Sequence, residues 1–171
     1  TEKPGDLNDL NLHKLQLKLA KELSSCGKPI ILVLNLGRPR IISQIESDMA
    51  AIINIYLPGN LGADALVDIV SGDINPSGKL PYSYPAFPNA IAPYFHKPSE
   101  SLDWSQGAYD YSGKLVQLYP FGYGLSYTNF EYKDITIEDD SIGADDSLNI
   151  SLTVYNSGDV DGQEVVQVYV S

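Results

Sequence analysis

Cysteine, tryptophan, methionine and histidine are scarce in this chain of 171 residues, which has one cysteine, one tryptophan, one methionine and two histidines. A single cysteine, Cys26, excludes an intrachain disulfide and a cysteine-based zinc site. Metal sites are further limited because only His13 and His96 offer an imidazole ligand, and we expect neither a metal site nor a cofactor. The sequence shows no electropositive partner that would activate Cys26, so we expect an inert thiol near the end of a helix.

Basic residues are also few, with 11 Lys and Arg against 22 Asp and Glu and a formal net charge of −11. A nucleic acid or an anionic membrane surface would be repelled, whereas a neutral ligand such as a sugar would not. Apolar runs stay well below the ~20 residues of a membrane span, and the amino terminus lacks a signal-peptide pattern. We therefore expect neither a nucleic acid nor a membrane as a partner. The chain begins as though in mid-domain, so the missing leader says little about export.

The amino-terminal segment predicts a helix that ends near residue 25. Asp9 or Asn11 is suited to cap its start, and Gly27 is suited to the position past its end. Apolar residues recur at helical spacing and should face a core, while lysines take the outer face. These apolar residues are Leu12, Leu15, Leu19 and Leu23.

Buried strands and helices alternate in the segment that follows. Residues 30–34 are an unbroken apolar run of the kind that is buried on both faces of a parallel sheet. Residues 41–48 predict a short helix, and residues 51–57 predict a second strand. A helix over 63–70 should end at Gly72. Helix, strand, helix, strand, helix is typical of a layered α/β sheet with right-handed crossovers.

The composition changes after residue 80, where Pro, Tyr, Gly and Ser dominate and periodicity is lost. From residue 130 the pattern becomes β, with alternating apolar and polar residues over 130–137, 148–155 and 164–170. Three strands are the start of a β-sandwich, which takes about seven. We therefore expect a partial sandwich, completed by chain that is not given.

Two dense motifs flank this change: residues 75–82 read Asn-Pro-Ser-Gly-Lys-Leu-Pro-Tyr, and residues 118–127 read Leu-Tyr-Pro-Phe-Gly-Tyr-Gly-Leu-Ser-Tyr. Proline and glycine exclude a continued helix, and Asn75 can hydrogen-bond nearby backbone. Alternating glycines and rings suit a loop whose rings pack onto neighbours. From composition alone, both motifs are interpreted as loops that clamp elements together.

Together with five further segments, the two motifs resemble the carboxy-terminal part of the retaining β-glycosidases of glycoside hydrolase family three. The resemblance covers essentially the whole chain, in the family's order. It implies a carboxy-terminal part of an α/β-sandwich domain over 1–97, a connecting loop over 98–128, and the start of a fibronectin-III-like β-sandwich over 129–171. The five segments are 1–10, 27–35, 37–39, 57–63 and 155–159.

The resemblance also implies one catalytic residue, Glu2, which matches the acid/base glutamate that precedes a Pro-Gly-Asp turn in one branch of the family. The nucleophile would lie on an amino-terminal barrel domain that this chain lacks. Retaining hydrolysis uses two carboxyl groups about 5–5.5 Å apart, and Glu2 would protonate the leaving oxygen. Other branches place this glutamate a few residues earlier, and then Glu2 would be a solvated carboxylate.

Other side chains carry weaker hypotheses. The rings of Trp104, Tyr109 and Tyr111 are as a group candidates for lining the aglycone subsite, although each ring alone suits a packing role better. Arg38 and Arg40 are interpreted as structural ion-pairing residues rather than anion ligands. His96 suits a hydrogen-bonded loop position, and residues 149–151 form an Asn-Ile-Ser sequon.

The sequence thus predicts a fragment of an exo-acting β-glucosidase-like hydrolase that acts on terminal β-linked glucose, with a carbohydrate substrate and the barrel of the same parent protein as partners. The fragment alone should be inactive. A β-xyloside is the alternative substrate, and a secreted or periplasmic location fits. A non-catalytic accessory module that docks to a partner or a polysaccharide stays open. A nucleotide-binding module is disfavoured because no phosphate-binding loop is present.

Overall fold

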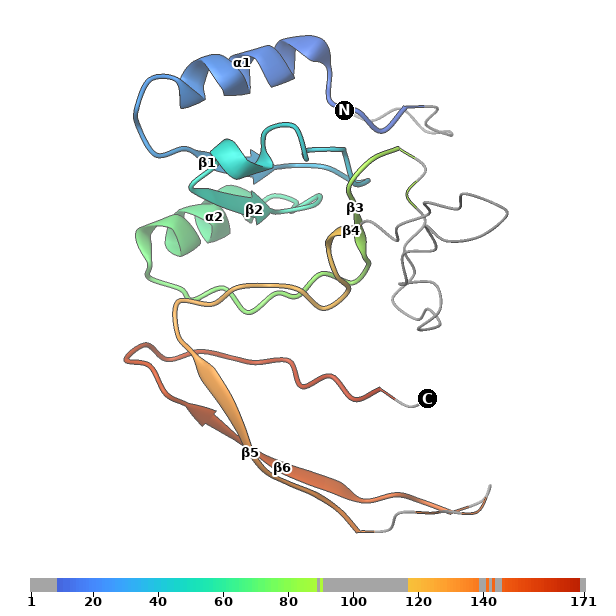
Figure 1. The fold of residues 1–171 in the computed structure, drawn as a ribbon. Coiled ribbons are helices and arrows are strands. Elements are labelled where there is room, and N and C mark those ends of the chain that lie inside the picture. Colours follow the sequence, from blue (N-terminus) through green and yellow to red (C-terminus); the bar gives the residue numbers. More distant parts are fainter. Residues whose placement is uncertain are drawn as a thin grey trace, which may run out of the picture. The chain divides into compact units, whose positions relative to one another are not determined.

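The computed structural model describes residues 9–88, 90, 117–138, 141, 143 and 146–169. The chain forms two compact units, one of Thr1–Val67 with Lys79–Tyr123 and the other of Asp68–Gly78 with Gly124–Ser171. Figure 1 shows the elements of both units along the chain.

The first helix, α1, spans Lys14–Ser24 and is capped by His13. The His13 Nδ1 accepts a hydrogen bond from the Leu15 backbone N–H at 3.2 Å, and Gln16 Oε1 accepts one from the His13 backbone N–H at 3.1 Å. The prediction of Asp9 or Asn11 as the cap is wrong. The Asp9 carboxylate is instead occupied by the Asn11 backbone and side-chain amides, at 2.9 and 2.7 Å.

The predicted leucine stripe of α1 is largely exposed. Leu15, Leu19 and Leu23 have exposed fractions of 69%, 60% and 46%. Leu17 and Ala20, on another face of the helix, pack against the core instead. The prediction of the buried face is therefore wrong beyond Leu12, because α1 carries two apolar faces and spacing alone does not say which one meets the core.

Strands β1, Ile31–Leu34, and β2, Ala51–Asn54, pair in parallel with Ile31 opposite Ala51. This pairing confirms the predicted α/β arrangement. Leu34 is buried, but Ile31 and Val33 are 46% and 38% exposed. The prediction that the first strand is buried on both faces is wrong for the described residues, since the core packs only against its Leu32 and Leu34 side.

The core of the first unit lies between α1, the strand pair and the segment that links the strands. Its buried residues are Leu34, Ile42, Ile45 and Tyr84. The linking segment was predicted as a helix over 41–48, but only Glu46–Asp48 is helical, as a 3-10 turn labelled η1. β-Branched residues at 41, 42 and 45 favour this irregular path, because they fit poorly in a helix interior.

Helix α2 covers Gly62–Ser71 and ends before Gly72, whose φ of 87° is the left-handed conformation expected there. A Cβ on Gly62 would lie 2.4 Å from the Pro58 Cβ, so only glycine fits where the helix begins. Two short strands were not predicted: β3, Tyr84–Pro85, pairs antiparallel with β4, Gln117–Tyr119.

The second unit contains an antiparallel hairpin of β5, Phe130–Ile137, and β6, Ile150–Asn156. The register shifts between Lys133 and Thr136, where Asp134 has a φ of 53°. Such a bulge keeps apolar residues on one face on both sides of the shift. Two of the three predicted strands are therefore confirmed. The third is wrong, because the described residues 164–169 form no strand ladder.

Asn75 holds three segments of the second unit together. Its Oδ1 accepts hydrogen bonds from Ser126 Oγ at 2.9 Å and from the Tyr127 backbone N–H at 2.8 Å. Its Nδ2 donates to the Asp161 carbonyl at 3.0 Å. The two sequence motifs that contain Asn75 and Tyr127 thus act as the structural clamp that their composition predicts.

Candidate functional site

The carboxyl ends of β1 and β2 meet at one edge of the parallel strand pair, which is where open α/β sheets bind ligands. Asn54 is the last residue of β2, and Tyr56 follows two residues later. Arg38 follows the end of β1 at the same edge. This edge brings an amide, a phenol and a guanidinium onto neighbouring loops, so we take it as the candidate site.

Tyr56 has an unusual backbone conformation, with a φ of 50°. A bulky side chain rarely adopts this left-handed region, and the cost is of the order of 1–3 kcal/mol. Asn54 Oδ1 accepts a hydrogen bond from the Tyr56 backbone N–H at 3.4 Å. The residue is 36% exposed, so its ring borders both the protein and solvent.

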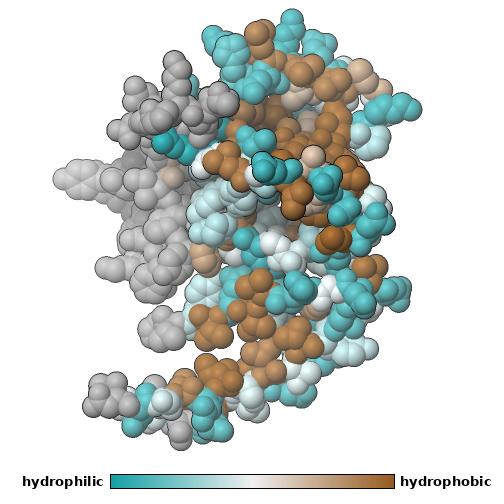
Figure 2. Space-filling model, turned by 180° about the vertical axis from the view of Figure 1, so that it is seen from behind, coloured by the Kyte–Doolittle hydropathy of each residue, from teal (hydrophilic) through white to brown (hydrophobic). Residues whose placement is uncertain are grey.

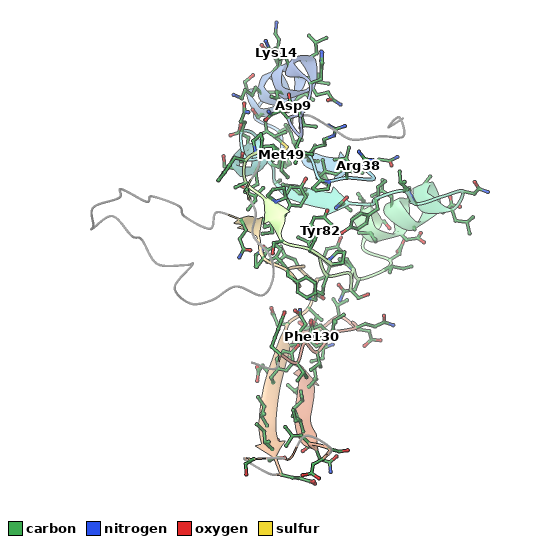
Figure 3. All side chains as sticks on the ribbon, turned by 90° about the vertical axis from the view of Figure 1, so that its right-hand side faces the viewer. Asp9, Lys14, Arg38, Met49, Tyr82 and Phe130 are labelled. Atoms are coloured by element: carbon green, nitrogen blue, oxygen red, sulfur yellow. The ribbon has the colours of Figure 1, made fainter. Side chains whose placement is uncertain are left out.

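Five tyrosines form a continuous row from this edge into the first unit. Edge contacts join Tyr56 to Tyr82 and Tyr84 to Tyr119, with ring centroids 6.5 and 6.0 Å apart. Tyr82 and Tyr84 lie 6.0 Å apart, and Tyr119 stacks on Tyr123 at 4.9 Å. Figure 3 shows Tyr82 beside the strand pair. We call Tyr56, Tyr82, Tyr84, Tyr119 and Tyr123 the tyrosine row.

Three hydroxyls of the tyrosine row are held by hydrogen bonds. The Tyr82 hydroxyl accepts one from Asn54 Nδ2 at 3.3 Å. The Tyr84 hydroxyl donates to the Arg40 carbonyl at 2.7 Å. The Tyr119 hydroxyl donates to Glu46 Oε1 at 2.9 Å. These bonds fix the rings in place, as a preorganised binding surface requires.

Burial raises the pKa of the Tyr84 hydroxyl to about 12. Burial also raises the pKa of Tyr82, helped by the nearby Tyr56, and that of Tyr119, helped by the Glu46 carboxylate. All three phenols are therefore protonated at neutral pH. They are suited to hydrogen bonding and packing rather than to proton abstraction.

The site residues predicted from the sequence lie outside the described residues. These residues are Glu2, Trp104, Tyr109 and Tyr111. The predicted loop histidine, His96, also lies outside the described residues. The tyrosine row was not predicted as a group. A usable signal was present in residues 81–85, which read Pro-Tyr-Ser-Tyr-Pro, because alternate residues of an extended segment share one face.

The two predicted structural arginines differ. Arg40 Nη1 donates a hydrogen bond to the Asp9 carbonyl at 3.0 Å, which ties the start of the described chain to the loop after β1. Arg38 is half-buried, and within the part of the chain that the structure describes it makes no hydrogen bond or ion pair. Arg40 therefore makes a structural hydrogen bond, while the ion pair that was predicted for it stays a prediction. For Arg38, no ion pair is present among the described residues.

Among the described ranges, no three His, Cys, Asp or Glu side chains gather as metal ligands would. None of the helices formed by the described residues is both long and apolar enough for a membrane span. Aromatic and polar side chains, among them Tyr56, Tyr82 and Asn54, make up the candidate site.

This chain is similar to several known proteins. Residues 1–127 match the model of the glycosyl hydrolase family 3 C-terminal domain. A β-xylosidase from Formosa agariphila is 37% identical over 166 residues, which are 97% of this chain and 23% of that protein. A lysosomal β-glucosidase from Dictyostelium discoideum is 35% identical over 182 residues, covering 99% of this chain and 21% of that protein.

Solved structures of β-glucosidases are also similar to this chain. A β-glucosidase from Erythrobacter marinus superposes with a TM-score of 0.77 at 38% identity, over 90% of this chain and 20% of that one. A mutant β-glucosidase from Listeria innocua in complex with laminaribiose gives a TM-score of 0.80 at 29% identity, over 91% of this chain and 22% of that one. The chain belongs to glycosyl hydrolase family 3, and it spans about a fifth of the length of these relatives.

Proposed function

We propose that this chain is part of a retaining, exo-acting β-glycosidase that removes terminal β-linked glucose from oligosaccharides or polysaccharides. The observation that carries the proposal is the match of residues 1–127 to the family's C-terminal domain. The names of the relatives support it, since they are β-glucosidases and β-xylosidases. Within such an enzyme the chain supplies the acid/base residue rather than the nucleophile.

Glu2 is the proposed acid/base. In retaining hydrolysis one carboxylate attacks the anomeric carbon and displaces the leaving group, whose oxygen takes the proton of the second carboxyl group. The second group, now a carboxylate, then removes a proton from the water that releases the sugar. The nucleophile belongs to the amino-terminal barrel of the parent protein, so that barrel is the chain's proposed partner. Burial against the barrel would keep Glu2 protonated for the first step.

Trp104, Tyr109 and Tyr111 are proposed to contact the sugar or aglycone beyond the scissile bond. Aromatic rings present a flat apolar face to the C–H groups of a sugar, and the tyrosines add a hydroxyl. Residues 129–171 are proposed to begin a fibronectin-III-like sandwich, which the β5–β6 hairpin supports.

A secreted or periplasmic location is proposed for the parent protein. One relative is named a periplasmic β-glucosidase, from Salmonella typhimurium, and the Dictyostelium relative is named lysosomal. These names place both relatives outside the cytosol, where polysaccharide substrates are met.

The test is hydrolysis of aryl β-glucoside and aryl β-xyloside by the purified parent protein, next to the 171-residue chain alone. We expect turnover by the parent, with the glucoside preferred, and none by the chain. A preference for the xyloside would mean that the substrate carries terminal β-linked xylose rather than glucose, in line with the name of the Formosa relative. No turnover of either glycoside by the parent would favour a non-catalytic module that docks to a polysaccharide or a partner.

A further inference from the structure

Two described residues other than glycine have a positive φ: Tyr56 and Asp134. Asp134 is explained locally, because it occupies the bulge of the β5–β6 hairpin and a short polar side chain tolerates this conformation. Tyr56 lies in no bulge, and its side chain is bulky. Glycine or asparagine would adopt the same backbone at lower cost. A tyrosine at a position of backbone strain suggests that its side chain has a function that offsets the cost of the strain.

The surroundings of Tyr56 are built for a neutral, partly apolar ligand. Its ring makes an edge contact with the ring of Tyr82. The Tyr82 hydroxyl in turn accepts a hydrogen bond from Asn54 Nδ2. Leu57 and Leu61 follow on the same loop with exposed fractions of 75% and 74%. Hydrophobic residues also form a sizeable part of the surface on the face drawn in Figure 2. Rings and apolar side chains with a few fixed polar atoms are the usual lining of a small-molecule site.

The charge of the ligand follows from the groups at this edge. Tyr56, Tyr82 and Asn54 are neutral. Arg38 at the same edge is positively charged, but the net charge of −11 on the whole chain disfavours an anion. A sugar ring meets these conditions, since it is neutral, has C–H faces that stack on aromatic rings and has hydroxyls that bond to phenols and amides.

From this geometry we infer that Tyr56, supported by Tyr82 and Asn54, binds a sugar unit of the substrate on the leaving-group side of the scissile bond. The inference rests on the proposed function. It assigns the leaving-group side because the proposed acid/base, which protonates the leaving oxygen, is on this same chain. Tyr56 is a binding residue in this account and takes no part in proton transfer.

The experiment uses the full-length parent protein with two substrates of the same sugar. One is a β-linked disaccharide, whose leaving group is a sugar, and the other is the β-glycosyl fluoride, whose leaving group is fluoride. Tyr56→Asn removes the ring but suits the left-handed backbone, so it should fold at least as well as wild type. Asp134→Asn is the matched control, since it changes the other positive-φ residue.

For Tyr56→Asn we expect kcat/KM on the disaccharide to fall about tenfold, which corresponds to the loss of one good aromatic contact. For the glycosyl fluoride, kcat/KM should stay within about twofold of the wild-type value. The leaving group of that substrate is fluoride, so there is no leaving-group sugar for Tyr56 to contact. The unfolding temperature should be unchanged or higher. The control should leave both substrates unaffected.

Equal losses on both substrates, or an unchanged kcat/KM on the disaccharide, would overturn the inference while leaving the glycosidase proposal standing. A lowered unfolding temperature with unchanged kinetics would mark Tyr56 as a packing residue. If the wild-type parent hydrolysed neither substrate, the proposed function and this inference would fail together.

Discussion

The Tyr119 hydroxyl donates a hydrogen bond of 2.9 Å to Glu46 Oε1, which joins β4 to the 3-10 helix that lies 73 residues earlier in the chain. Bonds to a charged partner contribute about 1.5–3 kcal/mol when well buried, and both groups here are only half-buried. Tyr119→Phe should therefore lower the free energy of unfolding by about 1 kcal/mol, measured by urea denaturation with circular dichroism.

Tyr123→Phe is the control for this prediction. Its ring stacks on Tyr119, but its hydroxyl makes no hydrogen bond within the described part of the chain. It should change the free energy of unfolding by less than about 0.5 kcal/mol. Equal effects of the two substitutions would show that the bond to Glu46 contributes nothing specific.

Asn75→Ala should destabilise the second unit more than any surface substitution. It removes the acceptor for Ser126 Oγ and the Tyr127 N–H, and the donor to the Asp161 carbonyl. At about 1 kcal/mol for each bond, we expect a loss of about 2–3 kcal/mol in the free energy of unfolding. Asn60→Ala is the control, because Asn60 is exposed and makes no such bonds to the residues that the structure describes. A similar loss there would contradict this account.

Gly62→Ala should destabilise the start of α2. The added methyl would lie 2.4 Å from the Pro58 Cβ, and a proline ring cannot rotate away. Overpacking of this kind costs about 1–3 kcal/mol. Gly78→Ala is the matched control, because nothing lies within 4 Å of its Cβ position and its φ is not positive. The unfolding temperatures of the two variants test this difference. An unchanged unfolding temperature for Gly62→Ala would show that the loop before α2 can shift to make room for the methyl group.

The stability of the first unit should fall in alkaline solution. The pKa of Tyr84 is raised by burial to about 12 in the folded protein, whereas an unfolded tyrosine has a pKa of about 10. Below about pH 10 both states keep the proton, so the stability is fully present. Between about pH 10 and 12 the unfolded state alone loses it, and the free energy of unfolding decreases.

Urea denaturation at a series of pH values measures this decrease. The raised pKa values of Tyr82 and Tyr119 act in the same direction. Tyr84→Phe should make the decrease shallower, because the most buried phenol of the row is gone. An identical slope in this variant would mean that Tyr84 ionises as readily in the folded protein as in the unfolded chain.

Local patterns predicted the parallel strands well. Residues 30–34 and 51–57 are strongly apolar and β-branched, and the glycines at 27 and 72 have the positive φ expected past a helix end. Such features depend on neighbours in the sequence, so they could be read from it.

Features that depend on distant partners were missed or wrong. The spacing of Leu15, Leu19 and Leu23 predicted a buried stripe, but packing against Ile42 and Ile45 selected the face with Leu17 instead. The pairing of β3 with β4 joins residues more than 30 positions apart. The tyrosine row depends on that pairing, because it brings Tyr119 onto Tyr84. Residues 164–169 have a strand pattern but form no ladder within the described residues.

We propose that Glu2 is the acid/base of a retaining β-glycosidase, and azide rescue of Glu2→Ala in the full-length parent protein is the direct test of this claim. With an activated aryl β-glycoside, whose leaving group needs little protonation, the account predicts slow release of the sugar from the covalent intermediate. Azide should then restore turnover and give a β-glycosyl azide. Undiminished activity of Glu2→Ala, or an α-configured azide product, would contradict the claim.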